Sequence, residues 1–355
     1  LHQLPEPAWL SAELARARKA LGGGVEPITR EALSNAEAQA ASTRHPLCRF
    51  EVHGHKVRAC KHFSEKGHLR SLWRTLSILH HVQPLPDGMI FLVSSWDAES
   101  VEFPAPVFAR CGPRDSKSIV LLPSEFQTAW NYQHFLYEAT RTYGAVPFGE
   151  KVPVAFWRGS ATDYALIAEE AEDAGAPDRP VAVEVQEWSR LRLALLSRLY
   201  PDRIDAQFTG VNDFVPPALK AWIEEGGMCC AKHAEPWDLR SYRYLVNADA
   251  TQGVADRLHW YLATGSVVLQ QESNFTLWLL DTVIRPGVHF LPVDRRWQGL
   301  LAAMDWAEAH LDEASAMVER SHALAQEAMS PEAVFLYLHR VLRLYASQLD
   351  FIGPQ

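Results

Sequence analysis

The sequence lacks any apolar run approaching the roughly 20 residues that span a bilayer, and it shows no signal-peptide core near its N-terminus. Cysteine is scarce, and the odd set of five in 355 residues argues against a disulfide framework and favours a reducing compartment. Lys and Arg number 34 against 43 Asp and Glu. Because phosphate contacts need a basic face, the net charge of −9 argues against a general nucleic-acid-binding protein.

Several enzyme motifs are also missing. No G-x-G-x-x-G follows an expected strand and no G-x-x-x-x-G-K-[ST] occurs, which argues against dinucleotide-dependent oxidoreductases and P-loop enzymes. The serine-hydrolase motif G-x-S-x-G is absent too. Cys229 and Cys230 are adjacent, which is a poor spacing for joint zinc ligation. Asp97-Ala98-Glu99 is the nearest approach to the Asp-x-Asp that holds a metal in many sugar-nucleotide enzymes.

What the sequence does contain is an alternation of short apolar runs and longer helical patterns. The runs expected to be strands are residues 89–93, 118–122, 152–156, 204–208, 244–246, 267–269 and 289–293. Strands separated by helices form parallel sheets covered by helices, so the predicted fold class is α/β. Ser330-Pro331-Glu332 predicts the start of a long final helix that packs back across a domain. A chain of this length suits two domains, with a boundary expected near residues 149–152.

A series of sequence blocks, in a fixed order, is the most specific feature of the chain. The blocks are Leu85-Pro86-Asp87-Gly88 with Trp96-Asp97, residues 156–160, residues 189–192 with 205–209, residues 242–247 with Arg257, residues 263–269, residues 288–293 and the helix at 337–349. From about residue 85 onward the chain therefore resembles glycosyltransferase family 90. That family includes Rumi-type protein O-glucosyltransferases, fungal capsule xylosyltransferases and bacterial lipopolysaccharide-modifying proteins.

The resemblance implies a GT-B arrangement, in which two Rossmann-like domains face a central cleft. Residues 1–150, joined by the C-terminal helix at about 318–352, would form the acceptor-side domain, and residues 151–317 would bind the nucleotide sugar. It also implies inverting transfer from a UDP-sugar to a glycan or lipid-linked saccharide, with no metal and no further cofactor. The Ala-, Arg- and Leu-rich composition and the sparse cysteines favour a bacterial cytoplasmic protein, peripheral to the inner membrane, that acts on surface polysaccharide or lipopolysaccharide.

Asp97 is the candidate catalytic base. It follows an expected strand, at the carboxyl end where α/β sheets place their ligands. An inverting transferase needs a base within reach of the acceptor hydroxyl, and Asp97 matches the position of the base in Rumi-like enzymes. The alternative is that Asp97 only caps a turn.

Candidate donor-binding residues lie in the blocks of the second half. Arg158 and Arg257 could clamp the diphosphate bidentately, Arg257 near the positive end of a helix, and Gly159 would let a phosphate approach the backbone. The other donor-side candidates are Ser160, Thr162 and Ser266 for phosphate or ribose, Asp205 and Phe208 for the nucleobase, and Arg243, which stands where relatives often have Lys. The alternatives are surface ion pairs for the arginines, helix caps for the hydroxyls and a core position for Phe208.

The chain departs from the family on the donor side. Gln270 stands where many relatives have Lys, Asp249-Ala250 replaces Asp-Gly, and Gly287 replaces a Trp. Glucose and xylose donors both remain open. The departures also leave room for a non-catalytic glycan- or nucleotide-binding relative, while the missing glycine motif disfavours a nucleotide-sugar oxidoreductase.

A basic stretch near the N-terminus can be recognised from the residue charges alone, without reference to the family. Residues 44–74 hold eight Lys or Arg against Glu51 and Glu65, a local net charge of +6. We expect Lys56, Arg58 and Lys61 to face an anionic acceptor. The alternative is an ordinary solvated face.

Overall fold

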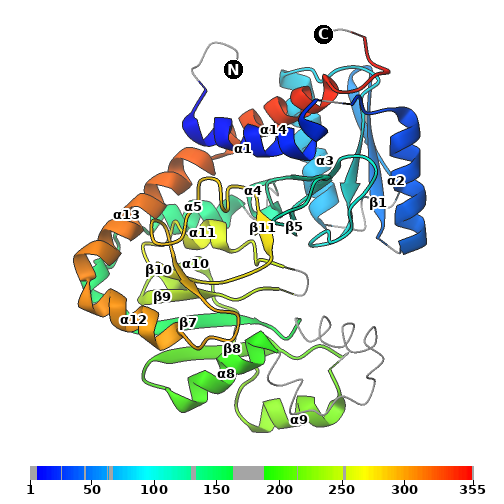
Figure 1. The fold of residues 1–355 in the computed structure, drawn as a ribbon. Coiled ribbons are helices and arrows are strands. Elements are labelled where there is room, and N and C mark those ends of the chain that lie inside the picture. The colour runs from blue at the N-terminus through cyan, green and yellow to red at the C-terminus, as the bar shows by residue number, and fades with distance from the viewer. Residues whose placement is uncertain are drawn as a thin grey trace. The chain divides into compact units, whose positions relative to one another are not determined.

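The computed structural model describes residues 6–24, 26–43, 45–61, 63, 67–128, 133–162, 188–213, 215–250 and 253–353 (Figure 1). Contacts divide the chain into two compact units. Unit 1 comprises Leu1–His134, Asn274–Ile284 and Glu327–Gln355, and unit 2 comprises Phe135–Ser273 and Arg285–Gln326.

This division differs from the boundary expected at residues 149–152. Unit 2 begins earlier because Phe135, near the start of α5 (Gln133–Arg141), lies 5.6 Å from the ring of Trp260. Unit 1 gains a segment of the expected donor domain because β11 (Phe275–Leu277) pairs with β5 (Cys111–Pro113).

Unit 1 is built on a five-stranded sheet in the order β2-β1-β3-β4-β6. The strands are β1 (Leu47–His53), β2 (Lys56–Ala59), β3 (Ile90–Ser94), β4 (Val107–Ala109) and β6 (Ile119–Leu121). β3, β4 and β6 are parallel and wholly buried, which is why two of them were predicted from apolar runs. β1 runs antiparallel to both neighbours. The sequence analysis did not predict β1, whose buried residues alternate with charged ones.

The final helix packs back onto this sheet, as predicted. α14 (Pro331–Ala346) begins at the expected cap, where the Ser330 side chain accepts a hydrogen bond from the Ala333 amide. Tyr337 and Tyr345 each donate their hydroxyl to a backbone carbonyl of β6 or β3, at 2.6 and 2.8 Å. The other helices of unit 1 are α1 (Ala8–Ala20), α2 (Arg30–Thr43), α3 (Gly67–Val82) and α4 (Glu125–Thr128).

Unit 2 carries a second five-stranded sheet, in the order β12-β10-β9-β7-β8, and all its pairings are parallel. Its strands are β7 (Val152–Ser160), β8 (Ile204–Gly210), β9 (Tyr242–Asn247), β10 (Val267–Gln271) and β12 (Leu291–Val293). Its other helices are α8 (Ser189–Leu199), α9 (Pro217–Glu225), α10 (Pro236–Leu239), α11 (Leu258–Tyr261), α12 (Leu300–Ala309) and α13 (Leu311–Ala328). The α/β class is therefore confirmed, with one sheet in each unit. The carboxyl ends of all strands of unit 2 share one edge of its sheet.

The cysteines correct the expectation that the chain has no disulfide framework. Cys48 in β1 is joined to Cys60 by a disulfide, and Cys229 is joined to Cys230. Cys111 is buried and belongs to neither pair. Four of the five cysteines are therefore paired. The antiparallel pairing of β1 with β2 brings Cys60 close to Cys48.

Candidate donor and acceptor sites

Two adjoining cavities lie along β7 in unit 2, a smaller one at the carboxyl end of the strand and a larger one that extends to Val152 at its start. The smaller, of about 170 Å³, is lined by Phe156, Arg158, Gly159, Ser160, Thr209, His233, Ala234, Leu239, Arg257, Trp260 and Tyr261. The larger, of about 580 Å³, shares Phe156, Arg158, His233 and Ala234 with it. The structure thus brings four predicted residues, Arg158, Gly159, Ser160 and Arg257, into one cavity, where α/β sheets bind ligands.

Arg158 is largely engaged by its own unit. Its Nη1 donates to the carbonyls of Trp157 and Asp205, both at 2.9 Å, and its Nη2 lies 2.8 Å from an Asp205 carboxylate oxygen. The guanidinium also lies over the Phe156 ring, 4.4 Å from its centroid. The Asp205 carboxylate neutralises Arg158, so Arg158 brings a fixed dipole rather than a full positive charge to the cavity wall.

Arg257 retains its charge. Its Nη1 donates to the Arg158 carbonyl at 2.6 Å, and no carboxylate among the described residues forms an ion pair with it. Arg257 directly precedes α11, which has four residues, so the predicted support from a helix dipole is small. The positive charge of the smaller cavity comes from this guanidinium itself.

Gly159 has a steric reason to be glycine. A Cβ there would lie 2.5 Å from a ring carbon of Trp157, which is wholly buried. Glycine therefore lets the end of β7 pass over the indole, and the same residue lines the cavity.

The end of β7 is held by an arginine that the sequence analysis did not single out. Arg190, 2% exposed, donates to the Ser160 carbonyl, the Thr162 hydroxyl and the Asp249 carbonyl, at 2.7, 2.8 and 2.7 Å. Thr162 thus serves as a partner of Arg190, and it does not line either cavity. The signal was its position in the family block at residues 189–192.

Three predicted donor residues lie elsewhere in unit 2. Arg243 is the second residue of β9, near the amino edge of the sheet, where it pairs with Glu308 at 2.6 Å and donates to the Gly149 and Lys151 carbonyls. Ser266 precedes β10 at the same edge and donates to the Tyr242 carbonyl at 2.7 Å. Phe208 is wholly buried against Trp157 and Trp188. This is the core position that the sequence analysis gave as the alternative for Phe208. None of the three lines either cavity.

The larger cavity adds aromatic and basic side chains that the sequence analysis missed. Trp237 is 44% exposed on α10, and Tyr242 stacks on Phe156 with ring centroids 4.2 Å apart. Burial first, then the Asp205 carboxylate, raises the pKa of Tyr242, whereas Arg158 lowers it. Lys232 is exposed at the rim. No sequence signal marked Lys232 and Trp237, which belong to the loop and short helix after Cys230, whereas Tyr242 stands in the family block at residues 242–247.

In unit 1, Asp97 lies just beyond the carboxyl end of β3, as predicted. Its side chain is 71% exposed, and its carboxylate forms an ion pair with Arg110, whose side chain is 13% exposed. The arginine follows β4, the neighbouring strand, so the parallel sheet sets the two residues side by side. An exposed carboxylate held by a buried guanidinium can accept a proton from a hydroxyl in solvent-accessible space.

A buried carboxylate supports the turn that carries Asp97. Glu99 is wholly buried and accepts hydrogen bonds from the Ser94 hydroxyl at 2.8 Å and the Val101 amide at 2.9 Å. The His45 Nδ1 lies 2.9 Å from Oε1, the Glu99 oxygen that also accepts from Val101, and the Trp96 amide donates to Ser94 Oγ at 3.2 Å. This network fixes the backbone on both sides of Asp97.

The three residues of the basic patch are exposed. Lys56 and Arg58 are two residues apart on the edge strand β2, so they share a face opposite buried Val57. Lys61 is exposed just after β2. Arg49, another member of the basic stretch, is neutralised by Glu37 and Glu51, and Arg44 and Lys66 lie outside the described residues.

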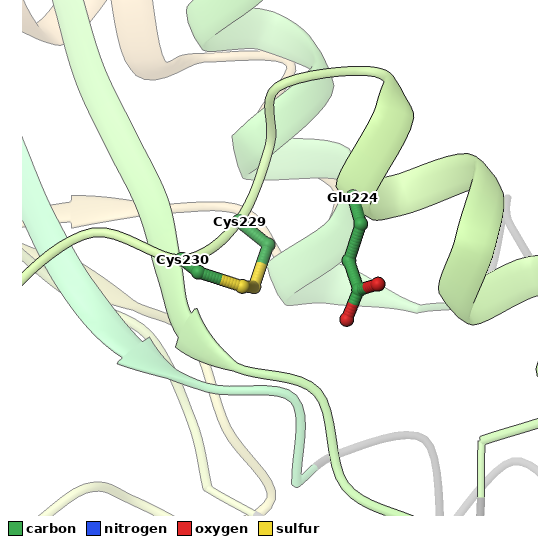
Figure 2. A group of neighbouring side chains, drawn as sticks. All are labelled: Glu224, Cys229 and Cys230. Atoms are coloured by element: carbon green, nitrogen blue, oxygen red, sulfur yellow. A yellow bond between two sulfur atoms is a disulfide. The ribbon is translucent and has the colours of Figure 1, made fainter.

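One group of three potential metal ligands was found where the structure is described. Glu224, Cys229 and Cys230 offer ligand atoms within 4.8 Å of one another (Figure 2). Figure 2 shows the Glu224 carboxylate beside the disulfide that joins the two sulfur atoms. Because metals bind thiolates, this oxidised pair supplies no sulfur ligand, and one carboxylate does not make a site.

Comparison with known proteins identifies the second half of the chain. Residues 182–353 match the model of glycosyl transferase family 90. The matched residues, just under half of the chain, are similar to that family. The match bears out the resemblance predicted from the sequence blocks.

The curated relatives carry related names. Protein O-glucosyltransferase 2 of Danio rerio is 25% identical over 321 residues, covering 88% of this chain and 57% of the relative. Protein O-glucosyltransferase 3 of Rattus norvegicus is 28% identical over 247 residues, covering 69% and 42%. The chain therefore spans about half the length of these relatives. A solved glycosyltransferase from Rickettsia africae aligns with 70% of this chain and 64% of its own at 13% identity and a TM-score of 0.37.

No helix in the described parts of the chain is both long enough and apolar enough to cross a membrane.

Proposed function

We propose that the protein is a glycosyltransferase that binds a nucleotide-sugar donor in the cavities of unit 2 and transfers its sugar to a hydroxyl group. The observation that carries the proposal is Arg257, whose charge has no carboxylate partner among the described residues and faces a cavity at the carboxyl ends of parallel strands. The match to family 90 and the names of the relatives support the reaction class.

The donor's diphosphate belongs in the smaller cavity in this proposal. Arg257 offers paired N–H donors that match phosphate oxygens, and Thr209 and His233 add polar groups. As the nucleotide leaves, negative charge grows on its phosphates, and a preorganised guanidinium stabilises that charge without rearranging. The larger cavity, with Trp237 and Tyr242 in its wall, suits a planar nucleobase. UDP is the proposed nucleotide, and the relatives' names favour glucose over xylose as the sugar.

Asp97 is the proposed base. Its carboxylate takes the proton from the acceptor hydroxyl while the hydroxyl oxygen attacks the anomeric carbon on the face opposite the nucleotide, so the configuration inverts. Arg110 orients the carboxylate, and the Glu99 network holds its turn. The proposed reaction uses no metal, because Arg257 takes the place of a divalent cation at the phosphates.

The proposed acceptor is a glycan or lipid-linked saccharide of the bacterial surface. Lys56 and Arg58, exposed on one face of β2, suit an acceptor with anionic groups. Reversing both charges should raise the KM for the acceptor and leave the KM for the donor unchanged. Unchanged acceptor kinetics would return this face to ordinary solvated surface.

The decisive experiment is release of UDP from a panel of UDP-sugars, with EDTA present, by wild type and Asp97→Asn. Slow hydrolysis of one donor, unaffected by EDTA and lost in the variant, is the expected result and names the sugar. Donor binding without release from any sugar, even with glycan extract added, would point instead to a non-catalytic binding protein. Release that needs a divalent cation would refute the role given to Arg257.

A further inference from the structure

The two disulfides of the chain differ in what they can do for the fold. Cys48–Cys60 joins residues 12 positions apart, and Cys48 is wholly buried. Cys229–Cys230 joins adjacent residues, which lie close together in the unfolded chain as well. Because a disulfide stabilises a fold mainly by restricting the unfolded chain, and less so for shorter loops, the Cys229–Cys230 bond contributes little to global stability. Its role must therefore be local.

The Cys229–Cys230 disulfide lies at the start of a segment that lines both cavities of unit 2. Residues 231–234 follow it directly, and all four line the larger cavity. His233 and Ala234 line the smaller cavity as well. Cys230 is exposed and Cys229 is half-buried, so the bond is open to reagents in solution. An accessible disulfide thus adjoins the proposed donor site.

Two backbone hydrogen bonds flank this disulfide. The Phe208 amide donates to the Met228 carbonyl at 2.9 Å, and the Ala231 amide donates to the Phe208 carbonyl at 3.0 Å. Phe208 is wholly buried, so it is a fixed anchor for both bonds. The disulfide restricts the two residues between these anchors, and the segment that lines the cavities begins at the second anchor.

The two anchors offer a competing explanation, in which they hold the segment whether or not the disulfide is present. A backbone hydrogen bond, however, contributes only a modest net stability, and ordering two residues costs at least as much conformational entropy as two such bonds return. The covalent link lowers that entropy cost. We therefore expect the order of the segment to depend on the disulfide.

We propose that Cys229 and Cys230 form a redox switch that sets the affinity of unit 2 for the nucleotide-sugar donor. In the oxidised state, the disulfide preorganises the segment that bears Lys232 and His233. In the reduced state the segment is less ordered, and the donor must order it in order to bind, which lowers affinity. The effect on the donor rests on the proposed function, whereas the effect on the segment does not.

The switch works by thiol–disulfide exchange with a dithiol reductant. One thiolate of the reductant attacks the exposed Cys230 sulfur, and the electron pair of the broken S–S bond passes to the Cys229 sulfur, which takes up a proton. The second thiolate of the reductant attacks its own sulfur in the mixed disulfide and releases the Cys230 sulfur, which is protonated in turn. The protein gains two electrons and two protons, and the reductant leaves as a disulfide. Oxidation by a small disulfide reverses these steps.

The Glu224 carboxylate slows this exchange. One of its oxygens and the two sulfur atoms all lie within 4.8 Å of one another, and Figure 2 shows the carboxylate beside the disulfide. A negative charge at this position repels an incoming thiolate and disfavours a thiolate on either cysteine. Glu224 therefore makes the switch resistant to brief changes in the surrounding thiols.

The test compares the full chain before and after treatment with dithiothreitol, with EDTA present so that no metal ion captures the reduced pair. Alkylation and mass spectrometry should show Cys229 and Cys230 reduced while Cys48–Cys60 stays intact. Amide exchange in residues 228–234 should become at least about 3-fold faster, and the Kd for UDP should rise about 3- to 10-fold. The variant Cys229→Ser/Cys230→Ser should match the reduced protein and should not respond to dithiothreitol.

The possible failures are distinguishable. Unchanged amide exchange, or equal UDP affinity in the two states, would overturn the switch and leave the donor site standing. A response to dithiothreitol in the double Ser variant would assign the effect to Cys48–Cys60 and also overturn it. If UDP bound to neither state, the proposed donor site would be refuted, and the effect on the donor with it.

Glu224→Gln tests the rate. Reduction by dithiothreitol should be about 2- to 5-fold faster than in wild type, because one nearby negative charge is removed. Glu225→Gln, which removes the same charge from the next exposed residue of α9, is the matched control and should react as wild type does. Equal rates in all three proteins would refute the role given to Glu224.

Discussion

The two units place charged groups of opposite sign at corresponding points of their sheets. In unit 1 a carboxylate, Asp97, follows the carboxyl end of β3, and in unit 2 a guanidinium, Arg257, lies at the carboxyl end of β7. Each is backed by a buried polar group that bonds to the surrounding backbone, Glu99 in unit 1 and Arg190 in unit 2. Both charged groups thus follow the carboxyl ends of strands, and the local residues determine whether this position holds the proposed base or the proposed phosphate-binding cation.

The units differ in how their charges are compensated. Asp97 is paired with an arginine that orients it, whereas Arg257 is held by a carbonyl and keeps its charge. Within unit 2, Arg158 and Arg243 are both neutralised by carboxylates. Compensation therefore separates an arginine that can bind an anion from arginines that stabilise the fold.

The strongest test of this comparison is Asp97→Asn. Loss of a general base should lower kcat by about 10²- to 10⁴-fold, and donor affinity should not change because the proposed donor residues belong to unit 2. Transfer assays and UDP titration measure the two quantities. Asp115→Asn is the control, an exposed aspartate of unit 1 outside the Asp97 turn. A variant that retains full transfer would show that the base lies elsewhere.

Arg257→Ala tests the other half of the comparison. Removing the uncompensated charge should lower donor-dependent turnover by about 10²- to 10³-fold, comparable to the loss of one oxyanion-stabilising donor. UDP affinity should also fall, in contrast to Asp97→Asn. Arg295→Ala, an exposed arginine of the same unit that lines neither cavity, should behave as wild type. If wild type, Arg257→Ala and Arg295→Ala all bound UDP with equal affinity, the diphosphate would not bind in the smaller cavity.

Arg243→Met should separate stabilising arginines from binding ones. Losing the pairing with Glu308 and the bonds to two carbonyls should lower the free energy of unfolding by about 2–3 kcal/mol. At temperatures where the variant is folded, its KM for the donor should equal that of wild type. Denaturant titration and donor kinetics provide both values, and a raised donor KM with unchanged stability would restore Arg243 to the donor site.

Strand polarity explains which site residues could be found from the sequence. All seven expected strands are present, and Arg158 and Ser160 end β7, so their place at the ligand-binding edge was predictable. The same reasoning places Arg243 and Ser266 at strand starts, away from the smaller cavity. β1 was missed because Arg49 and Glu51 interrupt its alternating buried residues. His233 and Trp237 reach the cavities through a loop whose path depends on tertiary pairing, since Phe208 bonds to Met228 and Ala231.

The smallest expected effect concerns Lys151, at the amino edge of the unit 2 sheet. Its ammonium donates to the Arg240 carbonyl at 2.7 Å and to Ser266 Oγ at 3.2 Å, and burial lowers its pKa to about 8. The unfolded chain, with a pKa near 10.5, then binds more protons than the folded one between pH 8 and 10.5, so Lys151 makes stability rise with pH in that window. Relative to Lys151→Met, wild type should gain on the order of 1 kcal/mol between pH 7.5 and 9.5. Denaturant titrations of wild type, Lys151→Met and the exposed control Lys117→Met measure this difference. A pH-independent difference would mean that Lys151 stays charged in the fold, and its carbonyl partners would then compensate fully for its burial.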